Sequence, residues 1–263
     1  MIPKIIHYFW AGSKDYPDSI QKCIDSWKWL LQDYQIIKWD ETSEVINNNR
    51  FAKEALRCKK YAFVADYMRL YALYNFGGIY MDTDVQVFKS FDDLLNERAF
   101  SGFESRKDVG VWLLASEKEN PIFKDMLDLY ESKRFIKDDG SYDMLPNPLV
   151  LKSVFKKYGF KLNGELQRNE YMTIFPMEYF CPLNPSNGIV EITRHTYAMH
   201  LFDGSWMTEK DRRRISLSHC YYGKLSKIMP SDIAIIFGKL IAAMEVGGIK
   251  NIIEKIIEKI KRL

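Results

Sequence analysis

The sequence predicts an α/β fold organised around one substantial domain. Its 263 residues are enough for one such domain or for two small ones. Apolar segments with strand character alternate with helical segments along most of the chain, and no Pro/Gly/Ser-rich linker or low-complexity tract divides them. Apolar residues make up 47% of the chain, which suits a globular core.

The N-terminal part is expected to alternate strands and helices. Residues 2–10 (IPKIIHYFW) are predicted to form a strand, and in open α/β sheets ligands bind just beyond the carboxyl ends of strands. Trp10 would therefore lie near a site, although a core aromatic is an equally good interpretation. The next elements are a helix capped at Asp18 or Ser19 and running to Leu31, a strand at 34–39, and a polar helical segment at 41–57 with a break at 47–49.

The segment 61–87 (YAFVADYMRLYALYNFGGIYMDTDVQV) predicts a helix, a glycine break and a buried strand. Residues 62–76 contain no Gly or Pro and repeat apolar residues at helical spacing. Gly77 and Gly78 are typical of a helix C-terminus, and residues 79–81 are a short apolar run typical of a buried strand.

Two carboxylates follow this strand and form the first candidate site. The strand is expected to end in these two aspartates, and Asp82 and Asp84 then point to the same side, because side chains alternate along a strand. Two carboxylates so close together need a cation or a positive partner to stay ionised, and hard oxygen ligands suit Mg²⁺ or Mn²⁺. A surface turn without function is the alternative. The upstream pair Asp66 and Arg69, which share a helix face, favours a metal or phosphate site.

The remainder of the chain continues the alternation. It is expected to contain strands at 99–103 and 109–114, a helix at 121–133, a polar loop at 135–143, a helix at 149–158, a strand at 171–175, a loop at 181–188 and a last strand at 196–201.

The last strand ends in the second candidate site, HLFDGSW at 200–206. His200 could be a third metal ligand, because imidazole suits Mn²⁺ beside carboxylates. Backbone amides around Gly204 and the Ser205 hydroxyl could hold phosphate oxygens. A hydrogen-bonded core histidine followed by an ordinary turn is the alternative.

The C-terminus differs in character from the preceding chain. Residues 249–263 repeat Ile at helical spacing with a Lys-rich polar face, so they predict an amphipathic helix. Such a helix could lie on an anionic membrane surface, or it could pack on the protein body or on a partner helix. We therefore divide the chain into a catalytic domain at 1–230 and a helical tail at 231–263. The basic cluster at 212–214 could contact a phosphate-bearing acceptor or be a solvated turn.

Composition excludes several classes of protein. The net charge of +3 is too balanced to indicate nucleic-acid binding in general. The four cysteines are scattered without a C-x-x-C pair, which indicates free thiols in a reducing compartment. We expect neither a signal peptide nor a membrane span, because an apolar strand begins at Ile2 and no apolar run is long enough.

Three motifs, in this order, resemble glycosyltransferase family 32. They are PKIIHYFWAG at 3–12, ADYMRLYALYNFGGIYMDTDV at 65–85 and HLFDGSW at 200–206, and the resemblance covers roughly residues 1–210. This family of DXD-containing sugar transferases is related to yeast α-mannosyltransferases and shares a catalytic core with the large clostridial glucosylating toxins. It implies a GT-A fold, which is a Rossmann-like sandwich with a mixed central sheet, together with Mn²⁺ or Mg²⁺, a nucleotide-sugar donor and retention of anomeric configuration.

The resemblance also implies roles for individual residues. Those for the donor are Trp10 stacking on the base, Tyr80 beside the nucleotide, Asp66 and Arg69 on the sugar hydroxyls, Asp82 on the ribose, and Ser205 and Trp206 on the diphosphate. Those for the metal are Asp84 as a direct ligand, Asp82 directly or through water, and His200 or Asp203 completing the shell. Asp82, Asp84, Asp66 and Arg69 are thus the candidate catalytic residues.

The resemblance also leads to expectations for the donor, the acceptor and the cellular location. We expect a UDP-hexose donor, with galactose favoured, and a saccharide or lipid-linked saccharide acceptor in bacterial capsule or surface polysaccharide synthesis. The enzyme would then be cytoplasmic, or peripheral at the inner face of the membrane. GDP-mannose-dependent α-mannosyl transfer is the alternative.

Two readings from other classes compete with the transferase. One is a non-catalytic module that binds sugar nucleotides, because binding needs the same residues. The other is a phosphatase of the haloacid-dehalogenase type, which also places D-x-D after an apolar strand. Its pattern requires Thr or Val two residues after the second Asp, where this chain has Gln86.

Overall fold

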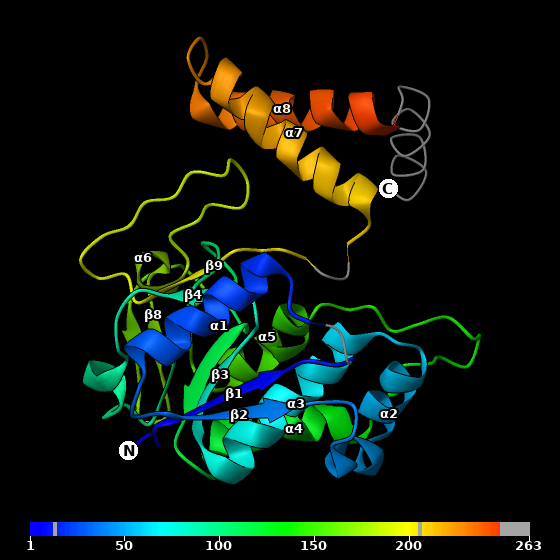
Figure 1. Ribbon diagram of the computed structural model, residues 1–263, viewed down its shortest axis with the longest axis vertical. Coiled ribbons are helices and arrows are strands. Elements are labelled where there is room, and N and C mark those ends of the chain that lie inside the picture. The colour runs from blue at the N-terminus through cyan, green and yellow to red at the C-terminus, as the bar shows by residue number, and fades with distance from the viewer. Residues whose placement is uncertain (13–14, 205–206, 248–263) are drawn as a thin grey trace. The chain divides into compact units, whose positions relative to one another are not determined.

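A seven-stranded mixed sheet forms the centre of the larger of two compact units of the chain (Figure 1). The computed structural model describes residues 1–12, 15–204 and 207–247. The strand order is β2-β1-β3-β6-β5-β8-β7, with β1 parallel to both β2 and β3, and β6 antiparallel to both β3 and β5. The strands are β1 (Ile5–Phe9), β2 (Gln35–Trp39), β3 (Gly78–Met81), β5 (Ala99–Gly102), β6 (Leu113–Ser116), β7 (Gln167–Arg168) and β8 (Thr173–Phe175). The predicted α/β class and mixed sheet are confirmed.

The helices follow the predicted order. They are α1 (Asp18–Leu30), η1 (Glu44–Asn48), α2 (Arg50–Arg57), α3 (Tyr61–Phe76), η2 (Asp92–Leu94), α4 (Pro121–Glu131), α5 (Asn147–Lys157) and α6 (Met177–Phe180). The strand expected at 109–114 is wrong in its first half. Val109 forms only an isolated bridge with Phe103, and β6 begins at Leu113.

Helices cover both faces of the sheet, as expected where parallel strands are buried. Neighbouring residues of β1 point to opposite faces. Tyr8 meets Trp27 of α1 edge-on, with ring centroids 5.6 Å apart, whereas Phe9 belongs to the hydrophobic core that includes residues of α2, α3, α4 and α5. The Trp27 indole N–H also donates to the Val85 carbonyl at 2.7 Å, which ties α1 to the chain leaving the acidic motif.

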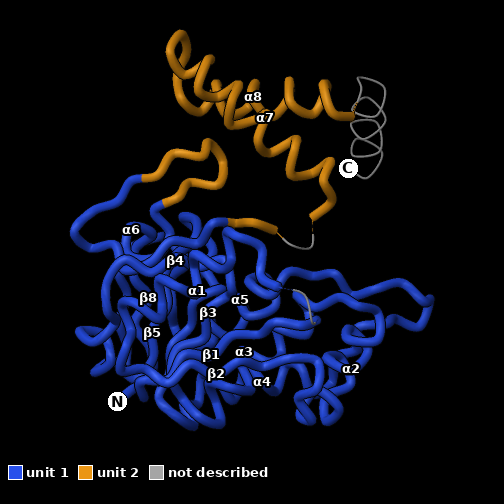
Figure 2. Tube along the Cα trace, in the orientation of Figure 1, with its two compact units in different colours: residues 1–182, 191–201 blue, residues 183–190, 202–263 orange. Residues whose placement is uncertain are grey.

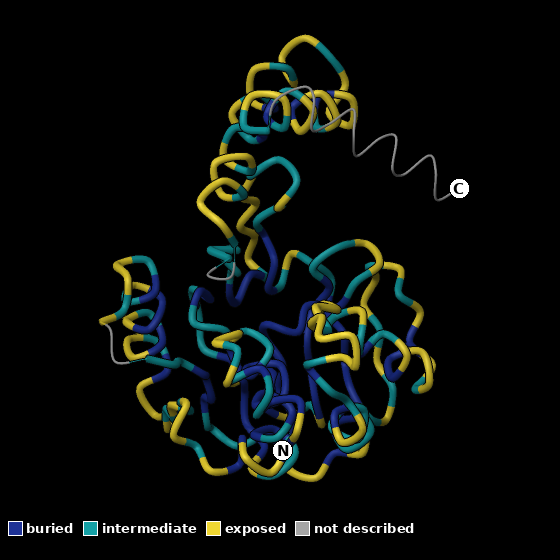
Figure 3. Tube along the Cα trace, turned by 90° about the vertical axis from the view of Figure 1, so that its right-hand side faces the viewer, coloured by how far each residue is buried: buried dark blue, intermediate teal, exposed yellow. Residues whose placement is uncertain are grey.

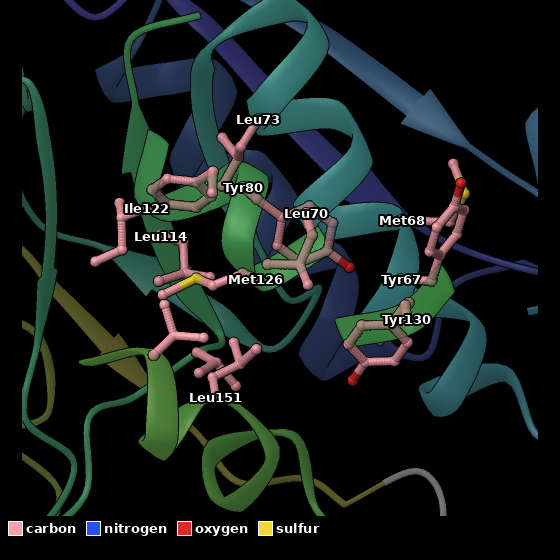
Figure 4. Close-up of a cluster of buried hydrophobic side chains, with 14 of the residues drawn as sticks. Tyr67, Met68, Leu70, Leu73, Tyr80, Leu114, Ile122, Met126, Tyr130 and Leu151 are labelled. Carbon is pink, nitrogen blue, oxygen red and sulfur yellow. The ribbon is translucent and has the colours of Figure 1, made fainter. Parts of the chain in front are cut away.

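Helix α3 is buried on nearly all sides because its apolar residues surround the helix axis. Figure 4 shows Leu70 and Leu73 of α3 beside Tyr80 of β3 and Leu114 of β6. Figure 3 shows that buried segments are concentrated in the interior of the part of the chain that carries the sheet. A charged residue on α3 therefore has to find its partner inside the protein.

A second, two-stranded sheet pairs β4 (Val85–Val87) with β9 (Ala198–His200) in antiparallel register. Val85 lies opposite His200, and the Leu201 amide donates to the Asp84 carbonyl at 3.0 Å. This pairing joins the first candidate site to the second across more than one hundred residues of sequence.

The chain divides into two compact units (Figure 2). Unit 1 comprises 1–182 and 191–201, and unit 2 comprises 183–190 and 202–263. The described part of unit 2 contains the helices α7 (Glu209–Leu225) and α8 (Ser231–Gly247). The compact units thus separate near residue 201, while the division into a catalytic domain at 1–230 and a tail at 231–263 stays a prediction. The amphipathic helix predicted at 249–263 lies outside the described residues.

The turn from α3 into β3 requires glycine at position 78. Gly78 has φ +101°, and a Cβ there would lie 2.5 Å from the Ile5 carbonyl oxygen of the neighbouring strand. Gly140 also has a positive φ of +80°, but a Cβ there would meet nothing within 4 Å.

We predict that Gly78→Ala lowers the free energy of unfolding by at least about 3 kcal/mol, whereas Gly140→Ala lowers it by only about 1 kcal/mol. Both variants pay for the left-handed backbone, but only Gly78→Ala forces β1 and β3 apart. Urea unfolding followed by circular dichroism measures the difference. Equal losses in the two variants would show that the close strand contact does not matter.

His7 is a buried histidine with a structural role. Its Nε2 lies 2.9 Å from the Gly77 carbonyl, and its Nδ1 accepts the Trp39 indole N–H at 3.2 Å. Burial lowers the pKa of His7 to about 4 from 6.5, and the Gly77 contact only partly offsets this shift.

We predict that the protein loses stability as the pH falls from 6.5 to 4. In that window unfolded His7 binds a proton that folded His7 refuses, and the shift corresponds to about 3 kcal/mol. His7→Gln should show a flatter decline over this window when thermal unfolding is measured from pH 4 to 7.5. An identical pH profile in the variant would contradict the assignment.

Candidate metal and donor site

The acidic motif occupies a turn between two strands. Strand β3 ends at Met81, and the Val85 amide donates to the Asp82 carbonyl at 3.1 Å, closing a turn before β4. The expectation that strand alternation aligns Asp82 with Asp84 is therefore wrong. The turn brings the two side chains together instead, and the hydrogen bonding of β3 and β4 on either side holds it in place.

Three residues converge at this turn in the way that a metal site requires. Asp82, Asp84 and His200 each offer one ligand atom, and these atoms all lie within 4.8 Å of one another. The His200 Nε2 lies 3.2 Å from the Asp84 Oδ1, and the register of β4 with β9 places His200 there. Among the described residues, Asp82, Asp84 and His200 form the group whose ligand atoms lie close enough together to hold a metal ion.

The electrostatics of the three-residue group fit a divalent cation. Burial raises the pKa of Asp82 to about 6; the Arg69 guanidinium opposes this rise, and the Asp84 carboxylate adds to it. Asp82 is thus mostly ionised at neutral pH, but it takes up a proton about two pH units sooner on acidification than a free aspartate does. A cation between the carboxylates would relieve both the burial and the repulsion, and oxygen ligands with one imidazole suit Mn²⁺ or Mg²⁺.

Arg69 links the acidic turn to helix α3. Its Nη2 lies 3.2 Å from Oδ1 of Asp66 and 3.2 Å from Oδ1 of Asp82. Its Nη1 donates to the Val111 carbonyl at 2.9 Å, and the residue is only 4% exposed. Burial raises the pKa of Asp66, and Arg69 opposes that rise. The guanidinium thus holds both carboxylates in position, while its predicted contact with sugar hydroxyls stays a prediction.

Tyr80 and Trp10 lie at different depths. Tyr80 is 1% exposed in the core, and the Arg69 guanidinium carbon lies 5.2 Å from the centre of its ring. Trp10 follows the end of β1 and is half-buried, and its ring meets Tyr16 edge-on at 5.0 Å. Its buried indole N–H has no hydrogen-bond partner among the described residues. Contacts of either residue with a nucleotide stay predictions.

The third motif is described only in part. His200 belongs to unit 1, whereas Asp203 belongs to unit 2. Ser205 and Trp206 lie outside the described residues, so their predicted contact with the diphosphate stays a prediction, as does the metal role of Asp203.

Three residues that the sequence analysis did not select surround the site. Asn147, the first residue of α5, donates to the Asp66 carbonyl at 3.3 Å, and its buried Oδ1 has no partner among the described residues. Trp112 stacks on His200, with ring centroids 4.8 Å apart. Burial raises the pKa of Glu104 to about 7, opposed first by His200. Of these three residues, only Asn147 had a local signal in the sequence, which is its position between Pro146 and Pro148.

We predict that the protein binds Mn²⁺ and that Asp84→Asn weakens binding at least tenfold, about 1.4 kcal/mol, because a charged ligand is lost. Asp93→Asn, which removes an exposed carboxylate elsewhere, is the matched control and should bind as the parent does. Isothermal titration calorimetry measures both. Affinity should also fall from pH 7 to pH 5, because Asp82 takes up a proton near pH 6. Undiminished binding by Asp84→Asn would place the cation elsewhere.

Comparison with known proteins shows which proteins the chain is similar to around the site. The family model described as "Glycosyltransferase sugar-binding region containing DXD motif" matches residues 17–101, which include the acidic turn and α3. Mannosyl phosphorylinositol ceramide synthase CSH1 of Saccharomyces cerevisiae is 30% identical over 171 residues, covering 60% of this chain and 43% of that protein. Inositol phosphoceramide mannosyltransferase 3 of Schizosaccharomyces pombe is 32% identical over 128 residues, covering 46% of this chain and 35% of that protein. The chain thus spans less than half the length of these two relatives.

Solved structures of glycosyltransferases are also similar to this chain. The PaToxG glycosyltransferase has a TM-score of 0.47 and 21% identity, over 60% of this chain and 69% of that chain. A glycosyltransferase involved in the glycosylation of the major capsid of PBCV-1 has a TM-score of 0.43 and 11% identity, over 77% of this chain and 95% of that chain. The segment that carries α3 and the acidic turn is thus similar to the sugar-binding region of DXD-containing glycosyltransferases, and the chain resembles the two mannosyl-transferring relatives over part of their length.

Proposed function

We propose that this protein transfers a hexose from a nucleotide sugar to a hydroxyl group of a saccharide or polyol acceptor, with a divalent cation at Asp82, Asp84 and His200. The observation that carries the proposal is the convergence of these three ligand atoms within 4.8 Å, beside the buried Asp66–Arg69 pair. A bound Mn²⁺ or Mg²⁺ would neutralise the charge that develops on the departing nucleoside diphosphate.

The protein's own residues supply orientation around the leaving group. Arg69 keeps Asp82 ionised and holds it against α3, so the acidic turn does not have to reorganise when the donor binds. Asp66 and the free Oδ1 of Asn147 offer acceptors for the hydroxyls of the donor sugar. The base of the nucleotide would stack on Trp10 at the end of β1.

We propose that the reaction retains the anomeric configuration. The bond between the anomeric carbon and the diphosphate oxygen breaks as the acceptor oxygen attacks from the same face, through a transition state with oxocarbenium character. The acceptor hydroxyl passes its proton to an oxygen of the departing diphosphate. A trapped covalent glycosyl-enzyme would contradict this route.

The relatives favour a mannose donor over the galactose donor expected from the sequence. Both relatives named above are fungal, and one is called a mannosyltransferase while the other is called a mannosyl phosphorylinositol ceramide synthase. They lend no support to a UDP-galactose donor or to a bacterial capsule. We therefore favour GDP-mannose as donor and an acceptor whose polar part is a polyol or saccharide, which includes the head group of a lipid.

We predict that GDP-mannose with Mn²⁺ raises the melting temperature, whereas UDP-galactose with Mn²⁺ does not, because ligand binding stabilises the folded state. Asp84→Asn should abolish the shift, and Asp93→Asn should retain it. Differential scanning fluorimetry with each nucleotide sugar is the measurement. A higher melting temperature with UDP-galactose, and none with GDP-mannose, would instead support UDP-galactose as the donor.

An assay of product formation distinguishes an enzyme from a non-catalytic module that only binds the sugar nucleotide. With myo-inositol or an oligosaccharide as acceptor, mass spectrometry should detect a product heavier by one hexose, and Asp84→Asn should form it at least one hundred times more slowly. Donor binding without transfer or hydrolysis would support the non-catalytic module.

A further inference from the structure

Helix α8 presents two different faces, and α7 covers one of them. The small residues Ala234, Gly238 and Ala242 are spaced four apart and buried. A Cβ on Gly238 would lie 2.9 Å from the Ser218 carbonyl oxygen of α7, so the two helices are in backbone contact along this face. The small residues on this face of α8 therefore allow α7 and α8 to pack closely as a helical hairpin.

The opposite face of α8 carries large apolar side chains in contact with solvent. Ile233 is 42% exposed, Ile236 64%, Phe237 47%, Leu240 42% and Met244 38%. We call these five residues the apolar stripe. At 100° per residue their spacing confines them to an arc of about 100°. A stripe of this kind on an otherwise well-packed hairpin indicates a surface that is covered in the working protein.

The net positive charge of unit 2 favours an anionic surface as the partner of the apolar stripe. By sequence, unit 2 holds 12 Lys and Arg against 7 Asp and Glu, whereas the remainder of the chain holds 26 against 28. The whole positive excess of the protein thus lies in the unit that carries the stripe. Lys239 lies on α8 within the span of the stripe, with its Nζ 3.4 Å from the Ser186 Oγ of the same unit. Exposed Lys227 adjoins Ile228, which is 79% exposed in the turn before α8.

We propose that the apolar stripe inserts into the interface of an anionic lipid bilayer, with the basic side chains of unit 2 on the lipid phosphates. Isoleucine, phenylalanine and leucine gain from partial burial among acyl chains, and each lysine or arginine near an anionic surface adds to binding. A second copy of the chain would bring another positively charged unit 2 against the first, which disfavours self-association. The apolar stripe includes none of the site residues, and residues 249–263 enter the argument only through their charge.

Vesicle flotation of the full chain tests the proposal. The protein should float with vesicles of phosphatidylcholine and phosphatidylglycerol at low salt. It should float much less with phosphatidylcholine alone or at 0.5 M NaCl, where the Debye length is roughly three times shorter than at 0.05 M. The double variant Ile236→Glu with Phe237→Glu should lower the partition coefficient at least tenfold. Its matched control is Leu166→Glu with Ile192→Glu, which alters side chains 55% and 58% exposed in unit 1 and should float as the parent does.

Two results would overturn the proposal. One is unchanged flotation of Ile236→Glu with Phe237→Glu, which would assign membrane binding to another segment of the chain. The other is a dimer of the parent, detected by light scattering in the absence of vesicles and lost in that double variant, which would make the stripe a contact between copies. Circular dichroism and Mn²⁺ binding of each variant verify that it is folded, because the substituted side chains lie outside the metal site.

Discussion

The buried guanidinium of Arg69 is the interaction on which the site depends. It is held inside α3 by Asp66, by the carbonyl of Val111 and by Asp82 of the acidic turn. Removing it would leave the buried Asp66 carboxylate and the partly buried Asp82 carboxylate without their cation, and breaking a buried ion pair costs about 3–5 kcal/mol. The same contact fixes the position of Asp82 relative to the helix. Structural stability and the geometry of the donor site are therefore set by one side chain.

This arrangement leaves the acidic turn short of positive charge. Burial raises the pKa of Asp82 to about 6, because Arg69, which is shared with Asp66, offsets only part of the rise and the Asp84 carboxylate adds to it. A divalent cation supplies what the protein alone lacks. Cation binding at this turn is therefore expected to be coupled to ionisation of Asp82.

Local sequence patterns predicted most elements of unit 1. The apolar repeat before Gly77 defined α3, and the short apolar run after Gly78 defined β3, because both signals depend only on neighbouring residues. Apolar composition misled at 109–114, where the chain forms one bridge and reaches β6 only at Leu113. Apolar residues before the acidic motif predict an extended strand through Asp84, but the chain turns there. A D-x-D sequence does not reveal the hydrogen bond that the Val85 amide donates to the Asp82 carbonyl.

The sequence by itself determined most of the candidate metal site and its ion pair, because Asp66, Arg69, Asp82 and Asp84 lie within one continuous segment whose spacing is readable. It also selected His200 as a candidate. Only the tertiary structure decided that His200 faces Asp84, that Asn147 reaches Asp66 and that α8 keeps its large apolar residues outside. The physical reason is that strand register and helix packing create these contacts between distant segments, and no local periodicity encodes them.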